Sequence, residues 1–230
     1  MKTIGLIGGM SWESSIEYYR IINEMTKDRL GGLHSAKCVM VSVDFGEIEP
    51  LMRENQWDAV TDHLILAARS VEQAGADFIV ICTNTMHKLA GDIQAAIHIP
   101  LLHIANATGE RIREQGCSIV ALLGTRFTME EDFYRGRLSQ QYGMHVIIPD
   151  RPEMEVVDRV IFDELCRGRI DPASKTAYLK IMDNLVTAGA QGIILGCTEI
   201  GLLVQQKDIH VPLFDTTRIH AEAAVEFALQ

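Results

Sequence analysis

The stretch GADFIVICTNT, residues 75–85, recurs in modified form as GAQGIILGCTE, residues 189–199, so that Cys197 falls at the position of Thr83. Two further stretches match at a nearly constant offset. HIPLL (98–102) matches HVPLF (210–214), and GLIGGM (5–10) matches ALLGTR (121–126). Such internal similarity is the signature of a duplicated structural unit. The chain is therefore predicted to consist of two similar halves, residues 1–115 and 116–230.

The local pattern of each half predicts an α/β unit with a parallel sheet flanked by helices. Short apolar runs alternate with longer amphipathic segments, such as the stripe Tyr18, Ile21, Ile22 and Met25 that follows the candidate N-cap Ser11. A C-terminal helix at about residues 216–230 can pack back on the first half. The expected strands are Ile4–Ile7, Val39–Val43, Phe78–Ile81, Leu101–Ile104, Ile119–Leu123, His145–Ile148, Ile193–Leu195 and Val211–Phe214.

The repeat also predicts where a ligand binds. Ligands of open α/β sheets lie outside the carboxyl ends of the strands, and Thr83 and Cys197 follow equivalent strands. Pseudo-symmetry would bring these two ends to face each other, so we expect the active site in the cleft between the two domains. Because strand side chains alternate between faces, only one of Cys82 and Thr83 can point into that cleft, and the repeat selects Thr83.

Composition excludes several classes of function. The formal net charge is −10 and basic residues are scattered singly, which argues against nucleic acid or an anionic membrane as a partner. The N-terminus reads as a first strand rather than a signal peptide, and no apolar run reaches the ~18 residues of a spanning helix. The five cysteines are odd in number and widely spaced, and paired Cys or His motifs are missing. We therefore expect a cytoplasmic protein without disulfides or bound metal.

Polar residues at the predicted strand ends suit the binding of a carboxylate and an ammonium group. Gly8-Gly9-Met10-Ser11 could hold an anion at a helix start, although a tight turn alone would also need its glycines, and the dinucleotide spacing G-x-G-x-x-G is missing. Thr83-Asn84-Thr85 and Cys197-Thr198-Glu199 offer hydroxyl, amide, thiol and carboxyl groups. Read singly, however, Cys197 could be a core thiol, and Asn84 and Thr85 could be turn residues.

Two further side chains could contribute to this site. His87 lies within one helical turn of Thr83, where it could polarise the site or serve as a structural hydrogen-bond donor. Arg53 could grip a second carboxylate bidentately, and a solvated arginine explains it equally well.

The motifs resemble those of the cofactor-independent aspartate/glutamate racemases. The resemblance rests on IGLIGGMSWES (4–14), NTMH (84–87), LGTRFTM (123–129) and GCTE (196–199), and it covers nearly the whole chain. In that family two similar α/β domains enclose the substrate, and a cysteine from each domain acts on opposite faces of the substrate Cα. The resemblance implies no cofactor. It also implies a set of substrate-binding residues, Met10, Asn84, Thr85, Thr125, Thr198 and Glu199, with Arg53 on the side-chain carboxylate and Arg167 as a weaker second cation.

The sequence departs from the family at Thr83, where a cysteine is usual. It is similar in this respect to atypical racemases that carry a Thr/Cys pair and are specific for L-aspartate and L-glutamate or act broadly on amino acids. Racemisation removes a proton from one face of Cα and delivers another to the opposite face. A thiol has a pKa of about 8.5 that helix ends and donors can lower, whereas a threonine hydroxyl is no base near neutral pH. Cys197 is therefore predicted to take the proton from the L-enantiomer, and Thr83, or a water that it orients, to deliver one to the other face.

Two other functions fit the sequence. The same superfamily resemblance also covers one-cysteine decarboxylases of malonate derivatives and isomerases of maleate. An enzyme of either kind would act on small dicarboxylates. A non-catalytic protein that binds an acidic amino acid is the other alternative. A homodimer is expected, because soluble oligomers most often have two-fold symmetry.

Overall fold

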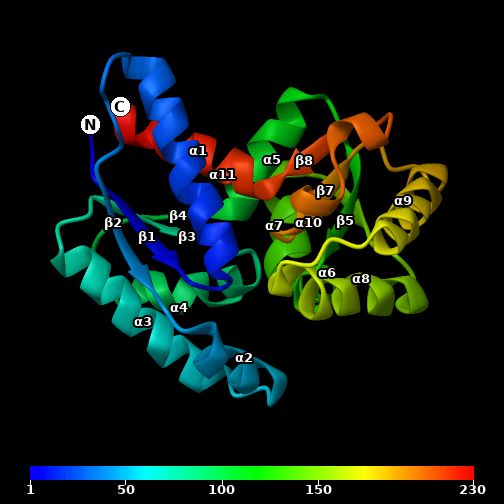
Figure 1. The fold of residues 1–230 in the computed structure, drawn as a ribbon, viewed down its shortest axis with the longest axis horizontal. Helices are drawn as coiled ribbons and strands as arrows, with labels where there is room; N and C mark the ends of the chain where they lie inside the picture. Colours follow the sequence, from blue (N-terminus) through cyan, green and yellow to red (C-terminus); the bar gives the residue numbers. More distant parts are fainter. The chain divides into compact units, whose positions relative to one another are not determined.

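The computed structural model describes all 230 residues, which divide into two compact units (Figure 1). Unit 1 comprises Met1–His103 and His220–Gln230, and unit 2 comprises Ile104–Ile219. The division precedes helix α5 (Ile104–Glu114), whereas the predicted boundary at residue 115 followed it. The helix belongs to unit 2 because it packs on α7 (Asp132–Tyr142), where the Tyr142 hydroxyl donates to Asn106 O at 3.0 Å.

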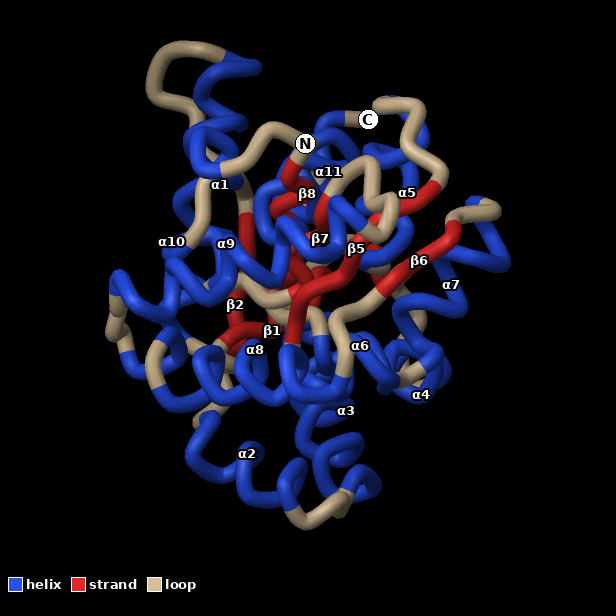
Figure 2. The backbone as a smooth tube through the Cα atoms, turned by 90° about the vertical axis from the view of Figure 1, so that its right-hand side faces the viewer, coloured by secondary structure: helices blue, strands red, loops and turns tan.

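Each unit contains one four-stranded parallel sheet, which confirms the predicted α/β class. The strand orders, β2-β1-β3-β4 and β6-β5-β7-β8, are the same permutation. Figure 2 shows the second sheet with β8, β7, β5 and β6 side by side. All eight predicted strands are present, with bounds that differ by a few residues: β1 Ile4–Gly8, β2 Cys38–Ser42, β3 Phe78–Ile81, β4 Leu101–Leu102, β5 Ile119–Gly124, β6 His145–Ile147, β7 Ile193–Gly196 and β8 Leu213–Asp215.

In unit 1, helices cover both faces of the sheet (Figure 1). Helices α1 (Trp12–Leu30) and α11 (Thr216–Leu229) pack on the face of β1 that carries Ile4 and Leu6. Helix α3 (Trp57–Gln73) covers the other face, where a Cβ added at Gly5 would lie 2.3 Å from Val71. The C-terminal part of α11 thus completes the core of unit 1.

Unit 2 has the same layered arrangement. Helices α8 (Arg151–Asp163) and α9 (Pro172–Thr187) bury their apolar stripes against β5 and β7 on one face, and α5 and α7 lie on the other side (Figure 1). The shorter helices connect these layers: α2 Phe45–Arg53, η1 Thr85–Leu89, α4 Ala90–Ala95, α6 Arg126–Glu130, η2 Leu165–Arg167, α10 Ile200–Leu203 and η3 Gln206–Asp208. None of the helices combines the length and the apolar composition that a membrane crossing requires.

The duplication extends to side chains that cover the edge strands. In unit 1, Gln94 accepts from Leu101 N at 2.8 Å and donates to Ile99 O at 3.1 Å. In unit 2, Gln206 accepts from Leu213 N at 2.8 Å and donates to Val211 O at 2.9 Å. Each glutamine thus occupies the place of a further strand at the start of an otherwise unpaired edge, which protects that edge from pairing with another chain.

Candidate active site

The carboxyl end of β1 continues into a tight loop, residues 8–11, that begins α1. Gly9 has φ +95°, and a Cβ there would lie 2.1 Å from Val43 O, so the loop needs glycine at this position. Gly9 N donates to Ser15 Oγ at 2.7 Å, and Ser11 Oγ accepts from Ser14 N at 3.4 Å, as predicted for an N-cap. Met10 is buried within this loop.

The polar residues 83–85 follow β3 at the same edge of the sheet. Parallel pairing of β1 with β3 places them beside residues 8–11, because Cys82 N donates to Ile7 O at 2.9 Å. Cys82 packs in the core with α1 and α11, Asn84 and Thr85 are buried, and Thr83 is half-buried. Unit 1 therefore brings Met10 and residues 83–85 together at the carboxyl end of its sheet.

His87 is a buried hydrogen-bond donor behind this loop. Its Nδ1 lies 2.8 Å from Thr83 O, and the residue is 2% exposed. Burial lowers the pKa of His87 well below its usual value, and the nearby rings of His103 and His220 lower it further. Of the two roles that the sequence left open for His87, the structure shows the hydrogen-bond donor.

In unit 2, Thr125 and Cys197 follow β5 and β7 at neighbouring positions. Gly124 pairs with Gly196, and a Cβ on Gly124 would lie 2.8 Å from Gly196 O, so the two strand ends can approach this closely only without side chains. Thr125 caps α6 by accepting from Thr128 N at 3.4 Å. Cys197 is buried, with 9% of the residue exposed.

One carboxylate oxygen organises the residues after β7. Oε2 of Glu199 lies 2.9 Å from Sγ of Cys197 and 2.6 Å from Oγ1 of Thr198, so it accepts from both side chains. Burial raises the pKa of the Cys197 thiol well above its usual value, and the Glu199 carboxylate raises it further. Our expectation that helix ends and donors lower this pKa was wrong, because burial and the neighbouring carboxylate outweigh the hydrogen bond from the backbone of Glu199.

The two strand ends differ at the positions that were predicted to transfer protons. Glu199 in unit 2 corresponds by the repeat to Thr85 in unit 1, and Cys197 corresponds to Thr83. Unit 2 thus offers a thiol next to a carboxylate that can accept its proton, whereas unit 1 offers a hydroxyl with threonine at the corresponding position.

The two candidate cations are exposed and ion-paired within their own segments. Arg53 ends α2 and contacts the carboxylate of Glu49 one turn earlier. Arg167 lies 3.6 Å from Asp163. Each arginine could meet a substrate carboxylate by exchanging this partner, and the assignment of Arg53 stays a prediction.

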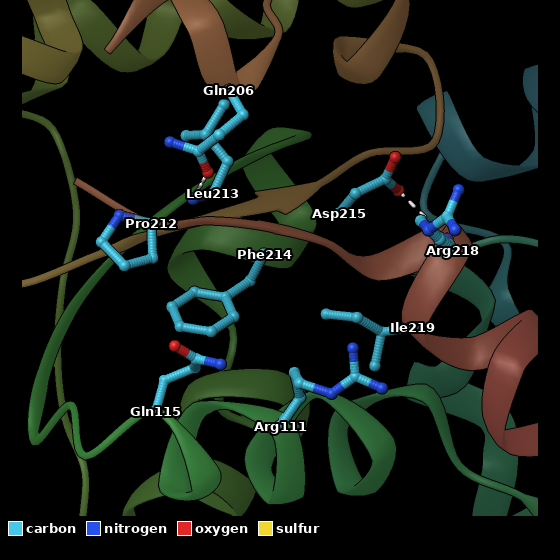
Figure 3. A pocket seen from close by; sticks show the side chains of 9 residues that line it. All are labelled: Arg111, Gln115, Gln206, Pro212, Leu213, Phe214, Asp215, Arg218 and Ile219. Atoms are coloured by element: carbon cyan, nitrogen blue, oxygen red, sulfur yellow. Dashed lines mark hydrogen bonds between the residues drawn. The ribbon is translucent and has the colours of Figure 1, made fainter. Parts of the chain in front are cut away.

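A separate cavity of about 260 Å³ lies along the outer side of β8 in unit 2 (Figure 3). Phe214, Leu213 and Ile219 supply its apolar wall, and Arg111 and Arg218 lie near one end. Asp215 accepts there from Arg218 N at 3.2 Å, near the start of α11. None of the predicted site residues lines this cavity.

Sequence reasoning missed two features of the site. The hydrogen bond between Glu199 and Cys197 was not expected, although a carboxylate two positions beyond a thiol could have indicated it; substrate binding by Glu199 stays a prediction. The cluster of His87, His103 and His220 had no sequence signal, because His220 reaches unit 1 only through the return of α11.

Comparison with known proteins gives a consistent set of relatives. Residues 7–224 match the family model described as Asp/Glu/hydantoin racemase. A crystal structure of a Yersinia pestis protein assigned as an Asp/Glu racemase is 56% identical, covers 100% of both chains and superposes with a TM-score of 0.93. An aspartate racemase homologue from Pyrococcus horikoshii is 34% identical over 100% of both chains, with a TM-score of 0.86. The broad specificity amino-acid racemase RacX of Bacillus subtilis is 25% identical over 73% of this chain and 72% of its own.

Proposed function

The chain belongs to the Asp/Glu/hydantoin racemase family, and on that premise we propose that it racemises an α-amino acid without a cofactor, with L-aspartate and L-glutamate as the preferred substrates. The observation that carries the proposal is the contact of Cys197 Sγ with Glu199 Oε2 at 2.9 Å. It joins a nucleophilic atom to a group that can accept its proton. Racemisation needs such a pair on one face of the substrate Cα.

The first step begins from the resting thiol. Glu199 takes the proton of Cys197, and the thiolate so formed removes the Cα proton of the L-enantiomer, which leaves a carbanion delocalised into the substrate carboxylate. The electrons of the broken C–H bond stay on the substrate, and the proton passes to sulfur. Glu199 afterwards loses its proton to solvent. Activation of a weak nucleophile by an adjacent base is a general device of enzymes.

The second step completes inversion from the opposite face. Thr83, or a water that it orients, donates a proton to Cα, and the donor regains a proton from solvent. The threonine side has no counterpart of Glu199, so it serves as a proton donor better than as a base. Cα exchange should therefore be faster with the L-enantiomer than with the D-enantiomer. Because the equilibrium constant between enantiomers is one, kcat/KM stays equal in the two directions and the asymmetry appears in kcat, KM and exchange.

Substrate recognition is assigned to the buried polar groups at the two strand ends. Backbone N–H groups and side chains of Met10, Asn84, Thr85 and Thr125 are proposed to hold the α-carboxylate and the ammonium group, together with Thr198. Oriented donors of this kind also stabilise the charge that develops when Cα is deprotonated. Arg53 is proposed to bind the side-chain carboxylate of aspartate or glutamate.

The proposal is tested by proton NMR of L-aspartate, L-glutamate and L-homoserine in D₂O with the purified protein and no added cofactor, followed by chiral analysis. We expect loss of the Cα–H signal and appearance of the D-enantiomer, fastest for the two acidic substrates. No exchange and no inversion with any of the three would overturn the racemase proposal. Faster reaction of homoserine would overturn the role of Arg53.

A further inference from the structure

We propose that His87 is a positioning residue for Thr83, whose main-chain carbonyl it holds through Nδ1–H. The inference rests on the proposed racemase function, in which Thr83 acts on the second face of Cα. His87 does not touch the Thr83 hydroxyl in this arrangement. It fixes the backbone from which that hydroxyl projects.

The geometry defines which nitrogen of His87 carries the proton. Nδ1 lies 2.8 Å from Thr83 O, and a carbonyl oxygen only accepts, so Nδ1 is the donor. The backbone adds a second constraint on the same loop, because His87 N donates to Asn84 O at 3.0 Å. The short helix η1 thus folds back on the residues that precede it and closes a ring of hydrogen bonds around residues 83–87.

Thr83 needs such a support because it is the first residue beyond the sheet. The β3 ladder ends with Cys82, whose N–H donates to Ile7 O at 2.9 Å. Thr83 O lies outside this ladder, and a buried carbonyl away from the ladder is normally paired with another donor. His87 supplies that donor, and the direction of the Thr83 side chain follows from the peptide plane that His87 fixes.

Two other buried imidazole rings lie beside the His87 ring. The ring of His103 lies 4.7 Å from it and that of His220 lies 5.5 Å from it, centroid to centroid. His220 is itself fixed: Nε2 donates to Leu102 O at 2.8 Å, so Nδ1 accepts from the Tyr18 hydroxyl at 2.9 Å. Burial lowers the pKa of His220 to about 4 and that of His87 well below its usual value, so both rings are neutral at pH 7.

The repeat shows that this support belongs to unit 1 alone. The residue that corresponds to His87 in unit 2 is Gly201, which has no side chain. There the reactive sulfur of Cys197 is held directly by Glu199 at 2.9 Å. The threonine has no such partner at the corresponding position, and an indirect support through its backbone replaces it.

The test compares His87→Leu, which removes the donor, with His87→Asn, whose Nδ2–H can stand in for Nδ1–H. For each variant, two rates are measured with L-aspartate in D₂O: loss of the Cα–H signal, which Cys197 begins, and formation of D-aspartate, which also needs Thr83. Because a displacement of about 1 Å in a reacting group can cost about 100-fold in rate, we expect His87→Leu to lower the ratio of inversion to exchange by about 10- to 100-fold. His87→Asn should restore most of that ratio.

His220→Leu is the matched control, because it removes a buried histidine of the same cluster and leaves the Thr83 contact in place. It should lower the melting temperature while its ratio of inversion to exchange stays at the wild-type value. Equal ratios in His87→Leu and His87→Asn, or the same fall in His220→Leu, would overturn the inference. If His87→Leu does not fold, nitrogen NMR of the wild-type imidazoles still tests the inference. An Nε2–H tautomer of His87 would overturn it, because Nδ1 could then not donate to Thr83 O. Failure of the racemase proposal would be distinguishable from failure of this inference, because the wild-type protein would then show neither Cα–H exchange nor formation of D-aspartate.

Discussion

Replacing Glu199 by glutamine separates two accounts of how Cys197 becomes a base. In the structure, the thiol and the Thr198 hydroxyl share one carboxylate oxygen, at 2.9 and 2.6 Å. If Glu199 accepts the thiol proton, Glu199→Gln removes the acceptor and turnover falls. If instead Cys197 rests as a thiolate, removal of a neighbouring negative charge would favour that thiolate and turnover would rise. The two accounts predict changes of opposite sign.

The expected loss is about 100-fold or more in kcat/KM, equal for both enantiomers because their equilibrium constant is one. A hydrogen bond to a charged group contributes about 1.5–3 kcal/mol, and a general base contributes about 10²–10⁴-fold in rate. Each factor of ten in rate corresponds to about 1.36 kcal/mol, so a 100-fold loss corresponds to about 2.7 kcal/mol. This value lies within the range expected for the hydrogen bond. Glu199 is 3% exposed as a residue, so solvent should not replace its carboxylate readily.

The assay is racemisation of L-aspartate followed by circular dichroism, together with the rate of iodoacetamide labelling of the Cys197 peptide by mass spectrometry. Glu199→Gln should racemise more slowly and yet label faster at pH 7, because the carboxylate that raises the pKa of Cys197 is gone. Glu226→Gln, which changes an exposed carboxylate on α11, is the control and should alter neither rate. Racemisation by Glu199→Gln at or above the wild-type rate would refute the role of Glu199 as the proton acceptor.

Three further changes test other parts of the account. Cys197→Ser should abolish Cα exchange of L-aspartate in D₂O while aspartate still raises the melting temperature, and retained exchange would exclude Cys197 as the base. Thr83→Cys should increase Cα exchange of D-aspartate, and adding Thr85→Glu, the counterpart of Glu199, should increase it by about a further 100-fold; if neither variant exchanges the D-enantiomer faster than wild type, the correspondence of the two strand ends is not functional. His220 has its pKa lowered from 6.5 to about 4 in the folded protein, so the unfolded chain binds the extra proton first and the free energy of unfolding should fall by about 3 kcal/mol as the pH drops from 6.5 to 4. Urea unfolding at several pH values measures the total fall, to which buried His87 also contributes, and His220→Gln should make that total smaller by about 3 kcal/mol; an unchanged pH dependence in that variant would contradict this assignment.

The fold could be predicted because its signals are local and repeated. Apolar runs such as Ile193–Gly196 predict strands by themselves, and their recurrence predicts two similar sheets. The bounds were less predictable where tertiary contacts decide them. Val211 was expected in a strand, but the ladder begins only at Leu213, because Pro212 has no N–H to donate and Gln206 caps the edge. Ile104 likewise begins α5 and does not extend β4.

The site could be predicted only in part, since the sequence identifies groups but not their partners. The repeat indicated that Thr83 and Cys197 follow equivalent strands. Within each unit the motifs follow neighbouring strands of the sheet, so their residues lie close together. The partner of each group depends on side-chain directions that no spacing specifies. Glu199 contacts Cys197, and this contact changes the expected resting state of the thiol. His220 is 202 residues from Tyr18 in the sequence and still shares its hydrogen bond.

In the proposed mechanism different groups act on the two faces of Cα, and the fate of one hydrogen atom distinguishes this mechanism from one in which a single group serves both faces. L-[2-²H]aspartate is incubated with the protein in H₂O, and the first few per cent of D-aspartate formed is isolated and analysed by mass spectrometry. We expect D-aspartate without deuterium at Cα, because Cys197 retains the isotope and the Thr83 side delivers a solvent proton. D-aspartate that still carries the deuterium would show that a single group moved the hydrogen between faces, and would contradict the two-group mechanism.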